Sequence, residues 1–469
     1  MSASGGGQEL QASLHQRHMT MIAIGGAIGA GLFVGSGSAI SGAGPAAVVS
    51  YAVAGILVML VMRMLGEMVV AQPMKGSFSD YARLALGRGA GFTIGWLYWY
   101  SFVIIVAIEA VAGGAILHGW MPGVPPWAFS FVLLTLMTGV NLISVKSFAE
   151  FEFWFASIKV AAIIVFLALG TAFVVGMWPG RNGPDFSNLT AAGGFAPAGF
   201  AAALSSIVVV IFAFGGAEIV TIAAGESKEP EKSVAKATTS VIWRIAIFYI
   251  GSVFLVVAMV PWTQARPSLS PYVGALNALK IPYAGTVMEA IILTSVLSVL
   301  NSALYVSSRM LHVLTRHGDA PHALVKLNKR GVPARAILLG TTIGYLAVFA
   351  QHLSPDAVFA FLTNSAGAVA IFMYLIIAAS QLRLRSRLEH AAPEKLTFKM
   401  WGYPYLTYLV LIAFTVVLLS MAVMEKTRVE LMTSLLSLGV VVGVYVVRNY
   451  LRRDINPDVP VAVETPPVV

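Results

Sequence analysis

Apolar stretches of about 20 residues recur along the whole 469-residue chain, and they restrict its fold more than any other feature. Each stretch is long enough to cross a hydrocarbon layer about 30 Å thick as an α-helix. Hydrophobic residues make up 58% of the chain and charged residues 11%, with a mean hydropathy of +0.82, so the apolar surface exceeds what one soluble core can bury. The sequence therefore predicts an all-α integral membrane protein.

Twelve spans are predicted from these apolar runs. The polar, Gly-rich residues 1–18 contain no apolar signal-peptide core, so we expect a disordered cytoplasmic tail there, and residues 451–469 are expected to form a second tail. The predicted spans are residues 19–41, 46–71, 91–118, 126–144, 150–176, 199–224, 240–262, 283–312, 333–351, 355–382, 403–424 and 429–450.

Basic residues are unevenly divided between the two sides of this topology, within a formal net charge of +9. Arg83, Arg335, Lys399 and many others fall in loops on the side of the N-terminus, and few fall in the opposite loops. Cytoplasmic loops of membrane proteins carry such an excess. We therefore expect both termini in the cytoplasm and the chain in a bacterial inner membrane. The charge then reflects orientation in the lipid bilayer, and no nucleic-acid partner is expected.

Residue types suited to metal or covalent chemistry are scarce in the sequence. The chain has no cysteine, which excludes a disulfide and a thiolate metal site, and its eight histidines lack ligand spacing. No nucleophile is paired with a base at one membrane depth, as an integral membrane enzyme would require. We expect neither an enzyme nor a protein that holds a metal or a cofactor.

Two predicted spans are interrupted by glycine at corresponding places. The motifs "GGAIGAG" and "FAFGGAE" each open a block of five spans, and the odd number inverts the second block relative to the first. We therefore expect residues 19–176 and 199–382 to form inverted repeats, with two added spans in 403–450. A helix that breaks within the membrane frees N–H and C=O groups for a bound polar solute. The alternative is that these glycines only allow close helix packing.

Among the ionisable residues within predicted spans, where a charge costs about 2.5 to 3.5 kcal/mol, four stand out. They are Arg63, Glu109, Lys159 and Glu218. Glu218 follows the second glycine break, so it could move with a gating half-helix or act as a structural tether. Arg63 lies near the inner end of its span and is interpreted as an interfacial anchor.

Lys159 and Glu109 carry the most informative of these charges. Lys159 lies about two turns inside its span, where a desolvated lysine can exchange a proton during a transport cycle. The alternative is that its ammonium snorkels to the inner interface. Glu109 lies near the middle of the third span with nothing polar for a turn on either side. It could bind a substrate ammonium, or it could pair with Lys159 or another buried cation.

Several long motifs resemble those of one transporter family. They are "IGGAIGAGLFVGSG", "GPAAVVSYAVAGILVMLVMRMLGEM", "SVKSFAEFEFWFASIKV", "GAEIVTIAAGESKEPEKSVAKATTSVIWRI" and "LNSALYVSSRML". The chain is similar over residues 15–450 to the amino acid, polyamine and organocation superfamily, and within it to the bacterial amino acid transporter family of proton-coupled permeases. Through "IGWLYWY" and "RHGDAP" it most resembles γ-aminobutyrate permeases. One departure is Val299, where some γ-aminobutyrate carriers have a cysteine.

The resemblance implies a leucine-transporter-like fold of about twelve helices with helices 1 and 6 broken, in agreement with the glycine pattern. It also implies that N–H groups at one break hold the substrate carboxylate, that carbonyls at both breaks meet the ammonium, and that Phe214 acts as a gate. The predicted substrate-binding residues are Ala27, Ile28, Gly29, Ala30, Gly31, Glu109, Phe212, Ala213, Phe214 and Gly215, and the predicted proton-coupling residues are Lys159 and Glu218.

The expected function is proton-coupled import of γ-aminobutyrate or a related ω-amino acid by alternating access. γ-Aminobutyrate separates its amine from its carboxylate by three carbons, so a second contact, for which Glu109 is the candidate, must accommodate the distal amine. One alternative is a permease for proline or another α-amino acid in the same fold. A further alternative is an amino acid sensor that binds without translocating.

Overall fold

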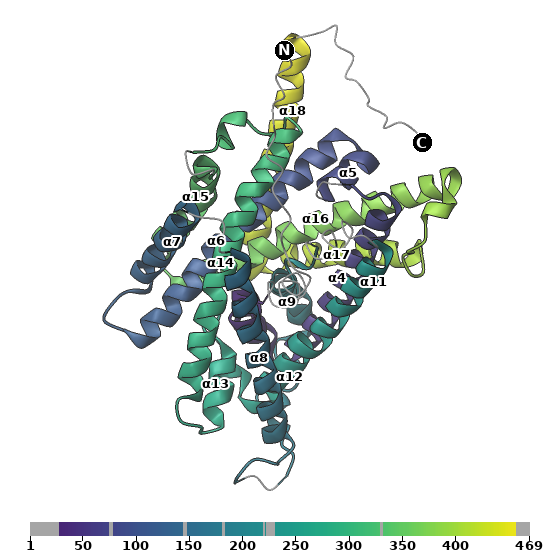
Figure 1. Ribbon diagram of the computed structural model, residues 1–469. Helices are drawn as coiled ribbons and strands as arrows, with labels where there is room; N and C mark the ends of the chain where they lie inside the picture. Colours follow the sequence, from purple (N-terminus) through teal and green to yellow (C-terminus); the bar gives the residue numbers. More distant parts are fainter. Residues whose placement is uncertain are drawn as a thin grey trace.

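The computed structural model describes residues 28–74, 78–143, 148–180, 183–218, 221, 230–328 and 332–455. These residues form helices of very different lengths and no strand (Figure 1). The helices of eight or more residues are α3 (Gly35–Ala43), α4 (Ala47–Ala71), α5 (Phe78–Leu86), α6 (Arg88–Trp120), α7 (Pro126–Ile143), α8 (Phe148–Val174), α9 (Gly199–Ala213), α11 (Pro230–Trp243), the π-helix η3 (Arg244–Gly251), α12 (Ser252–Met259), α13 (Pro271–Ala278), α14 (Ala284–Arg316), α15 (Ala334–Gln351), α16 (Pro355–Ala391), α17 (Tyr405–Val423) and α18 (Glu425–Ile455).

Ten helical runs in the described ranges are long and apolar enough to cross a membrane, so the chain is a multi-pass membrane protein. The first run, Ala30–Ala71, contains the short helix α2 (Ala30–Phe33), α3 and α4. Gly44 has a φ of +64° at the end of α3, and the 3₁₀ turn η1 (Gly44–Ala46) then leads into α4. Glycine adopts this conformation at little cost, which permits the change of direction.

The helices divide into an inner and an outer group by the exposure of their side chains. Most of the apolar side chains of α6, α9 and α16 are buried, and Figure 1 shows α9 in the middle of the molecule. Helices α7, α17 and α18 instead expose many apolar residues, such as Phe131, Ile412 and Leu436. An apolar side chain on the outside of a membrane protein faces lipid, so the second group forms part of the lipid-facing surface.

Helix boundaries follow the predicted spans closely, with three extensions. Helix α16 continues to Ala391 beyond the predicted end at residue 382, and α18 continues to Ile455 beyond residue 450. The seventh span starts earlier than predicted, because α11, η3 and α12 run together from Pro230 to Met259. These extensions are amphipathic or charged, so a hydropathy pattern does not contain them. Helices α5 and α13 were not predicted either, because α5 is amphipathic and α13 has only eight residues.

A buried polar network joins three distant segments at one end of the bundle. The Glu67 carboxylate on α4 accepts hydrogen bonds from Gln381 Nε2 at 2.8 Å and from Arg385 Nη1 at 2.6 Å, both on α16. It also accepts one from the backbone N–H of Met400 at 2.5 Å. Arg63, one turn earlier on α4, places its guanidinium 3.7 Å from the ring centre of Phe398. Arg63 therefore anchors the segment before α17, where the sequence suggested an anchor at the interface.

Candidate functional site

The two glycine-interrupted segments meet deep in the protein. Helix α2 begins at Ala30, and α9 ends at Ala213, where Gly216 with a φ of +91° permits a turn. A Cβ atom added to Gly31 would lie 2.8 Å from the Cα atom of Ala213, so these two backbones are in direct contact. Predicted site residues from both breaks are thus brought together. Ala27 lies outside the described residues.

Glu109 faces the start of the first interrupted helix. Its side chain is 1% exposed, and each carboxylate oxygen lies 3.2 Å from the backbone nitrogen of Ala30, which donates to them. A Cβ atom on Gly29 would be 2.7 Å from Oε1 of Glu109, so glycine is needed for this approach. The first N–H groups of a helix lack partners within it and attract anions. Glu109 therefore occupies the place that the sequence assigned to a substrate carboxylate.

Lys159 lies on the other side of the same region. It is fully buried on α8, and its Nζ atom donates a hydrogen bond to Ser298 Oγ on α14 at 2.9 Å. Its ammonium does not snorkel to the interface, and its positive charge acts on the Glu109 carboxylate. Ser295, one turn before Ser298, donates to the Ile28 carbonyl at 2.8 Å. Helix α14 thus links the lysine to the first helix break.

Two of the carbonyl groups predicted to meet an ammonium already have partners. The Ile28 carbonyl accepts from Ser295, and the Phe212 carbonyl accepts from the backbone N–H of Gly215 at 3.1 Å. A carbonyl oxygen has two lone pairs, so each can accept one more donor. Phe212 itself is 8% exposed and lies within reach of Gly31. The Glu109 carboxylate is accordingly the strongest acceptor in this region.

Phe214 closes the second break from the side of α4. Its ring is 1% exposed and packs 4.8 Å from the Tyr249 ring and 6.1 Å from the Tyr51 ring, measured between centroids. A Cβ atom on Gly55 would touch this ring at 3.8 Å. A fully packed aromatic ring at a helix break separates the regions on its two sides. This position is compatible with the predicted gate.

Glu218 lies immediately after this turn and is 5% exposed. Its Oε1 atom accepts a hydrogen bond from the backbone N–H of Gly216 at 3.2 Å, so the carboxylate stabilises the turn that ends α9. Arg244 on η3 acts on the carboxylate through its charge, and Tyr98 on α6 acts on it as a hydrogen-bonding side chain. These contacts agree with the interpretation of Glu218 as a tether of the broken helix.

Arg244 is a buried charge that the sequence analysis missed. It begins the π-helix η3 and is 5% exposed. It lies only four residues after the predicted start of its span, and the sequence analysis did not single it out. The helix begins at Pro230 instead, which carries Arg244 into the protein. π-Helical segments occur frequently at functional sites. The π-helix would have pointed to Arg244, but a sequence pattern does not show it.

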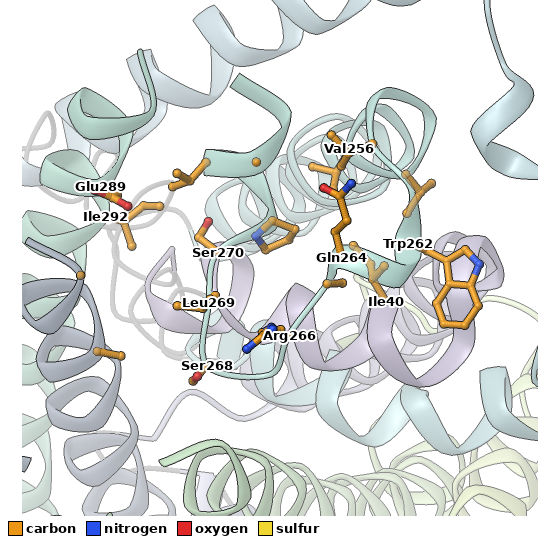
Figure 2. A pocket seen from close by; sticks show the side chains of 18 of the residues that line it. Ile40, Val256, Trp262, Gln264, Arg266, Ser268, Leu269, Ser270, Glu289 and Ile292 are labelled. Atoms are coloured by element: carbon orange, nitrogen blue, oxygen red, sulfur yellow. The ribbon is translucent and has the colours of Figure 1, made fainter. Parts of the chain in front are cut away.

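A cavity of about 230 Å³ lies beside the site, lined by α3, α6, α12, α14 and the segment before α13 (Figure 2). In Figure 2, Glu289 and Ile292 lie on one side of it and Trp262 on the other. None of the predicted substrate-binding residues lines this cavity. Ile292 is one helical turn from Ser295, so about 5 Å of α14 separates the cavity from the helix break. The cavity is thus close to the helix break but separate from the predicted site.

The segment between α12 and α13 covers α3 at this cavity. A Cβ atom on Gly37 would lie 2.3 Å from the Arg266 carbonyl oxygen and 2.6 Å from that of Leu269. The Ser38 hydroxyl donates to the Pro267 carbonyl at 3.3 Å, and Ser268 bonds to Asp356 at the start of α16. The approach from this side is therefore closed over the helix break.

Opposite charges buried beside two interrupted helices define a membrane transporter for a small polar solute. Within the described ranges there is no group of three or more histidine or carboxylate side chains placed to hold a metal ion. A sequence profile described as "Amino acid permease" matches residues 18–452. The chain belongs to the amino acid permease family and is an amino acid transporter.

Relatives with high identity carry related names. The chain is 52% identical over 444 residues to the gamma-aminobutyric acid permease of Bacillus subtilis, covering 95% of this chain and 94% of that protein. It is 46% identical over 463 residues to the gamma-aminobutyric acid permease of Escherichia coli, covering 98% and 99%. An aromatic amino acid transport protein of Corynebacterium glutamicum is 41% identical over 407 residues, covering 86% and 88%. All three are named as transporters, not enzymes.

Proposed function

We propose that this permease imports γ-aminobutyrate or a related ω-amino acid together with a proton, by alternating access. The observation that carries the proposal is the buried Glu109 carboxylate held by the N–H of Ala30 at the first helix break. An ω-amino acid has its opposite charges far apart, so it needs an anion site and a separate acceptor for its ammonium. Names of the relatives from Bacillus subtilis and Escherichia coli support the same substrate.

In the proposed complex the substrate carboxylate takes the N–H groups of α2 and displaces Glu109 from Ala30. The released carboxylate then accepts hydrogen bonds from the substrate ammonium, with the Phe212 and Ala213 carbonyls beside it. This exchange keeps every buried charge paired. An α-amino acid that binds at a single site does not require such an exchange. Phe214 closes over the ligand.

Lys159 is the proposed proton carrier. Its ammonium is fully buried, donates to Ser298 and acts on Glu109 through charge. Loss of the Lys159 proton would remove a positive charge next to the Glu109 carboxylate. The equilibrium between bound and released substrate would then change. Glu218 contributes by holding the turn after α9 while the half-helix moves.

The proposed architecture has residues 19–176 and 199–382 as inverted repeats, 403–450 as two added spans, and 1–18 and 451–469 as cytoplasmic tails. The close contact of Gly31 with Ala213 supports equivalent breaks in the two repeats. The excess of basic residues in one set of loops supports a cytoplasmic location of both termini in a bacterial inner membrane.

Uptake into proteoliposomes tests the substrate and the coupling together. Labelled γ-aminobutyrate is supplied under an inward proton gradient, with unlabelled β-alanine, proline, phenylalanine and lysine as competitors. We expect accumulation that collapses with a protonophore and is inhibited best by β-alanine. Accumulation of proline or phenylalanine instead would assign an α-amino acid substrate, and saturable binding without accumulation would indicate a sensor.

Lys159→Ala tests the proton carrier in the same vesicles. We expect the variant to lose gradient-driven accumulation but to retain exchange of internal for external substrate, because exchange needs no net proton movement. Ser157→Ala, on the same helix and half-buried, is the matched control and should accumulate substrate normally. Normal accumulation by Lys159→Ala would exclude this lysine from coupling.

A further inference from the structure

A second, smaller cavity lies at the end of the molecule opposite the one where α13 lies, and it is far from the helix breaks. Its volume is about 50 Å³, and its walls come from α5, the first residue of α6, the residues just after α14 and the last part of α18. Figure 1 shows α5 and the C-terminal part of α18 near the same end of the molecule. The lining residues are Arg83, Arg88, His317, Asp319, Tyr445, Arg448 and Asn449.

The charges of this cavity are predominantly positive. Three guanidinium groups line it together with the single carboxylate of Asp319, whose side chain is 7% exposed. Arg83 and Arg448 each form an ion pair with it, the latter at 3.0 Å. A second carboxylate, that of Asp80 on α5, lies 2.8 Å from the His317 ring, so two carboxylates stand against three guanidinium groups. Positive charge thus remains after the internal pairs are formed.

Several donors in the cavity are unused. The Nε atom of Arg83 is buried and has no hydrogen-bond partner in the part of the chain that the structure describes. Arg88 is exposed at the first position of α6, and its guanidinium group forms neither a hydrogen bond nor an ion pair with any described residue. A guanidinium group has five N–H donors in a planar fork that matches the oxygens of a phosphate. The arrangement therefore lacks an anionic acceptor.

The size of the cavity is suited to a small group of oxygens. A volume of about 50 Å³ accommodates roughly three to five water-sized oxygens, at about 10 to 15 Å³ each. A phosphate group presents four oxygens around one atom. A larger anion such as a nucleotide would not enter beyond its phosphate.

An exposed apolar surface lies directly beside this cavity. On α18 the residues just before Arg448 are apolar and exposed, with Val444 at 53%, Val446 at 58% and Val447 at 58% exposure. Tyr445 borders the cavity, and Tyr450 is 65% exposed one turn later. Aromatic and basic residues at the end of an apolar band mark the depth of lipid headgroups. An acyl chain can therefore lie along α18 while the headgroup reaches the arginines.

We propose that this cavity binds the phosphate of an anionic phospholipid headgroup, with Arg83 and Arg88 as its main donors and the exposed valines of α18 along its acyl chain. Basic pockets between membrane-spanning helices bind lipid headgroups of this kind. The proposed site joins α5, α14 and α18 through a ligand from the membrane. It is independent of the proposed substrate and proton.

Native mass spectrometry of the delipidated full-length protein tests the site. The probes are phosphatidylglycerol, phosphatidylcholine with the same acyl chains, and inorganic phosphate. We expect preferential retention of phosphatidylglycerol, weakened about fivefold by Arg88→Gln, since one basic residue near the surface contributes about 1 kcal/mol to anionic lipid binding. Arg83→Lys keeps the charge facing Asp319 but loses Nε, and should also weaken binding. Arg316→Gln, an exposed arginine at the end of α14 outside the cavity, should bind as the wild type.

Each result either supports or overturns the proposal. Equal retention of phosphatidylglycerol by the wild type and by both cavity variants would overturn the site. Equal retention of phosphatidylcholine would show that net negative charge is not recognised and would overturn the anionic lipid. Binding of inorganic phosphate without phosphatidylglycerol would assign the cavity to a soluble phosphate and overturn the lipid source. Size-exclusion profiles of the variants check that each is folded.

Discussion

Glu67 and Glu109 are both buried carboxylates on long helices, with exposures of 2% and 1%, yet their surroundings differ sharply. Glu67 accepts three hydrogen bonds of 2.5 to 2.8 Å, one of them from the guanidinium of Arg385. Glu109 shares a single N–H, that of Ala30, between its two oxygens at 3.2 Å. A saturated carboxylate holds a structure in one arrangement. A carboxylate with spare acceptor capacity can accept a ligand.

The number of hydrogen bonds that each carboxylate accepts distinguishes a structural from a functional charge, whereas burial alone does not. Glu67 joins α4, α16 and the segment before α17, and its three hydrogen-bond donors leave no place for a ligand. Glu109 lies where two interrupted helices meet and where glycine is needed on the facing backbone. We therefore expect substitutions at Glu67 to act on stability and substitutions at Glu109 to act on transport.

Glu67→Ala should produce the largest effect. Removing the carboxylate leaves the Arg385 guanidinium, whose side chain is 9% exposed, without its buried partner. Breaking a buried pair in this way costs about 3 to 5 kcal/mol of the free energy of unfolding. Denaturant unfolding in detergent micelles measures it. Glu389→Ala removes the other, 41% exposed partner of Arg385 and should cost no more than about 1 kcal/mol. Equal losses for both variants would contradict the assigned role of Glu67.

Glu109→Gln should reduce γ-aminobutyrate uptake about tenfold to a hundredfold, because a hydrogen bond to a charged group contributes about 1.5 to 3 kcal/mol. The amide oxygen can still accept from Ala30, so the free energy of unfolding should change by less than about 1 kcal/mol. Initial uptake rates and unfolding curves of the same preparation give both values. Per folded molecule, Glu67→Gln should transport at close to the wild-type rate. If Glu109→Gln transports normally but unfolds at a lower denaturant concentration than the wild type, the structural and functional roles of the two carboxylates have been assigned the wrong way round.

Gly31→Ala should lower uptake about tenfold. The added Cβ atom would lie 2.8 Å from a backbone atom of α9, which cannot rotate away, so the two breaks must separate by a few tenths of an ångström. Gly35→Ala is the matched control in the same segment, since its nearest neighbour would lie at 3.5 Å, an ordinary contact. Uptake rates per folded molecule compare the two. Similar rates for both variants would show that close contact of the breaks is not needed for transport.

Arg63→Gln should have the smallest effect. The change removes the stacking of the guanidinium on Phe398 and Trp401, at 3.7 and 4.5 Å, and the hydrogen bond to the Lys399 carbonyl. A cation–π contact at a partly exposed site contributes about 0.5 to 1 kcal/mol. We expect a loss of about 1 kcal/mol in stability with normal uptake. A strong loss of uptake would extend the functional region to the end of α4.

Much of the fold follows from local sequence properties. The spans are predictable because hydrophobic length is a property of consecutive residues, and the glycine motifs mark both interruptions. Glu109 and Lys159 are recognisable because a lone charge in an apolar run requires a reason. Arg244 and Arg385 were not recognised, since both lie near predicted span ends that the helices extend past.

The sequence by itself determined that this chain crosses a membrane many times, where its helices break and that Glu109 and Lys159 lie at depth. Only the tertiary structure decided which of those charges are satisfied. The partners of Glu67 lie 314 to 333 residues away in the chain, and the N–H that meets Glu109 lies 79 residues away. Hydropathy depends on neighbours in sequence, whereas hydrogen bonding of a buried group depends on neighbours in space.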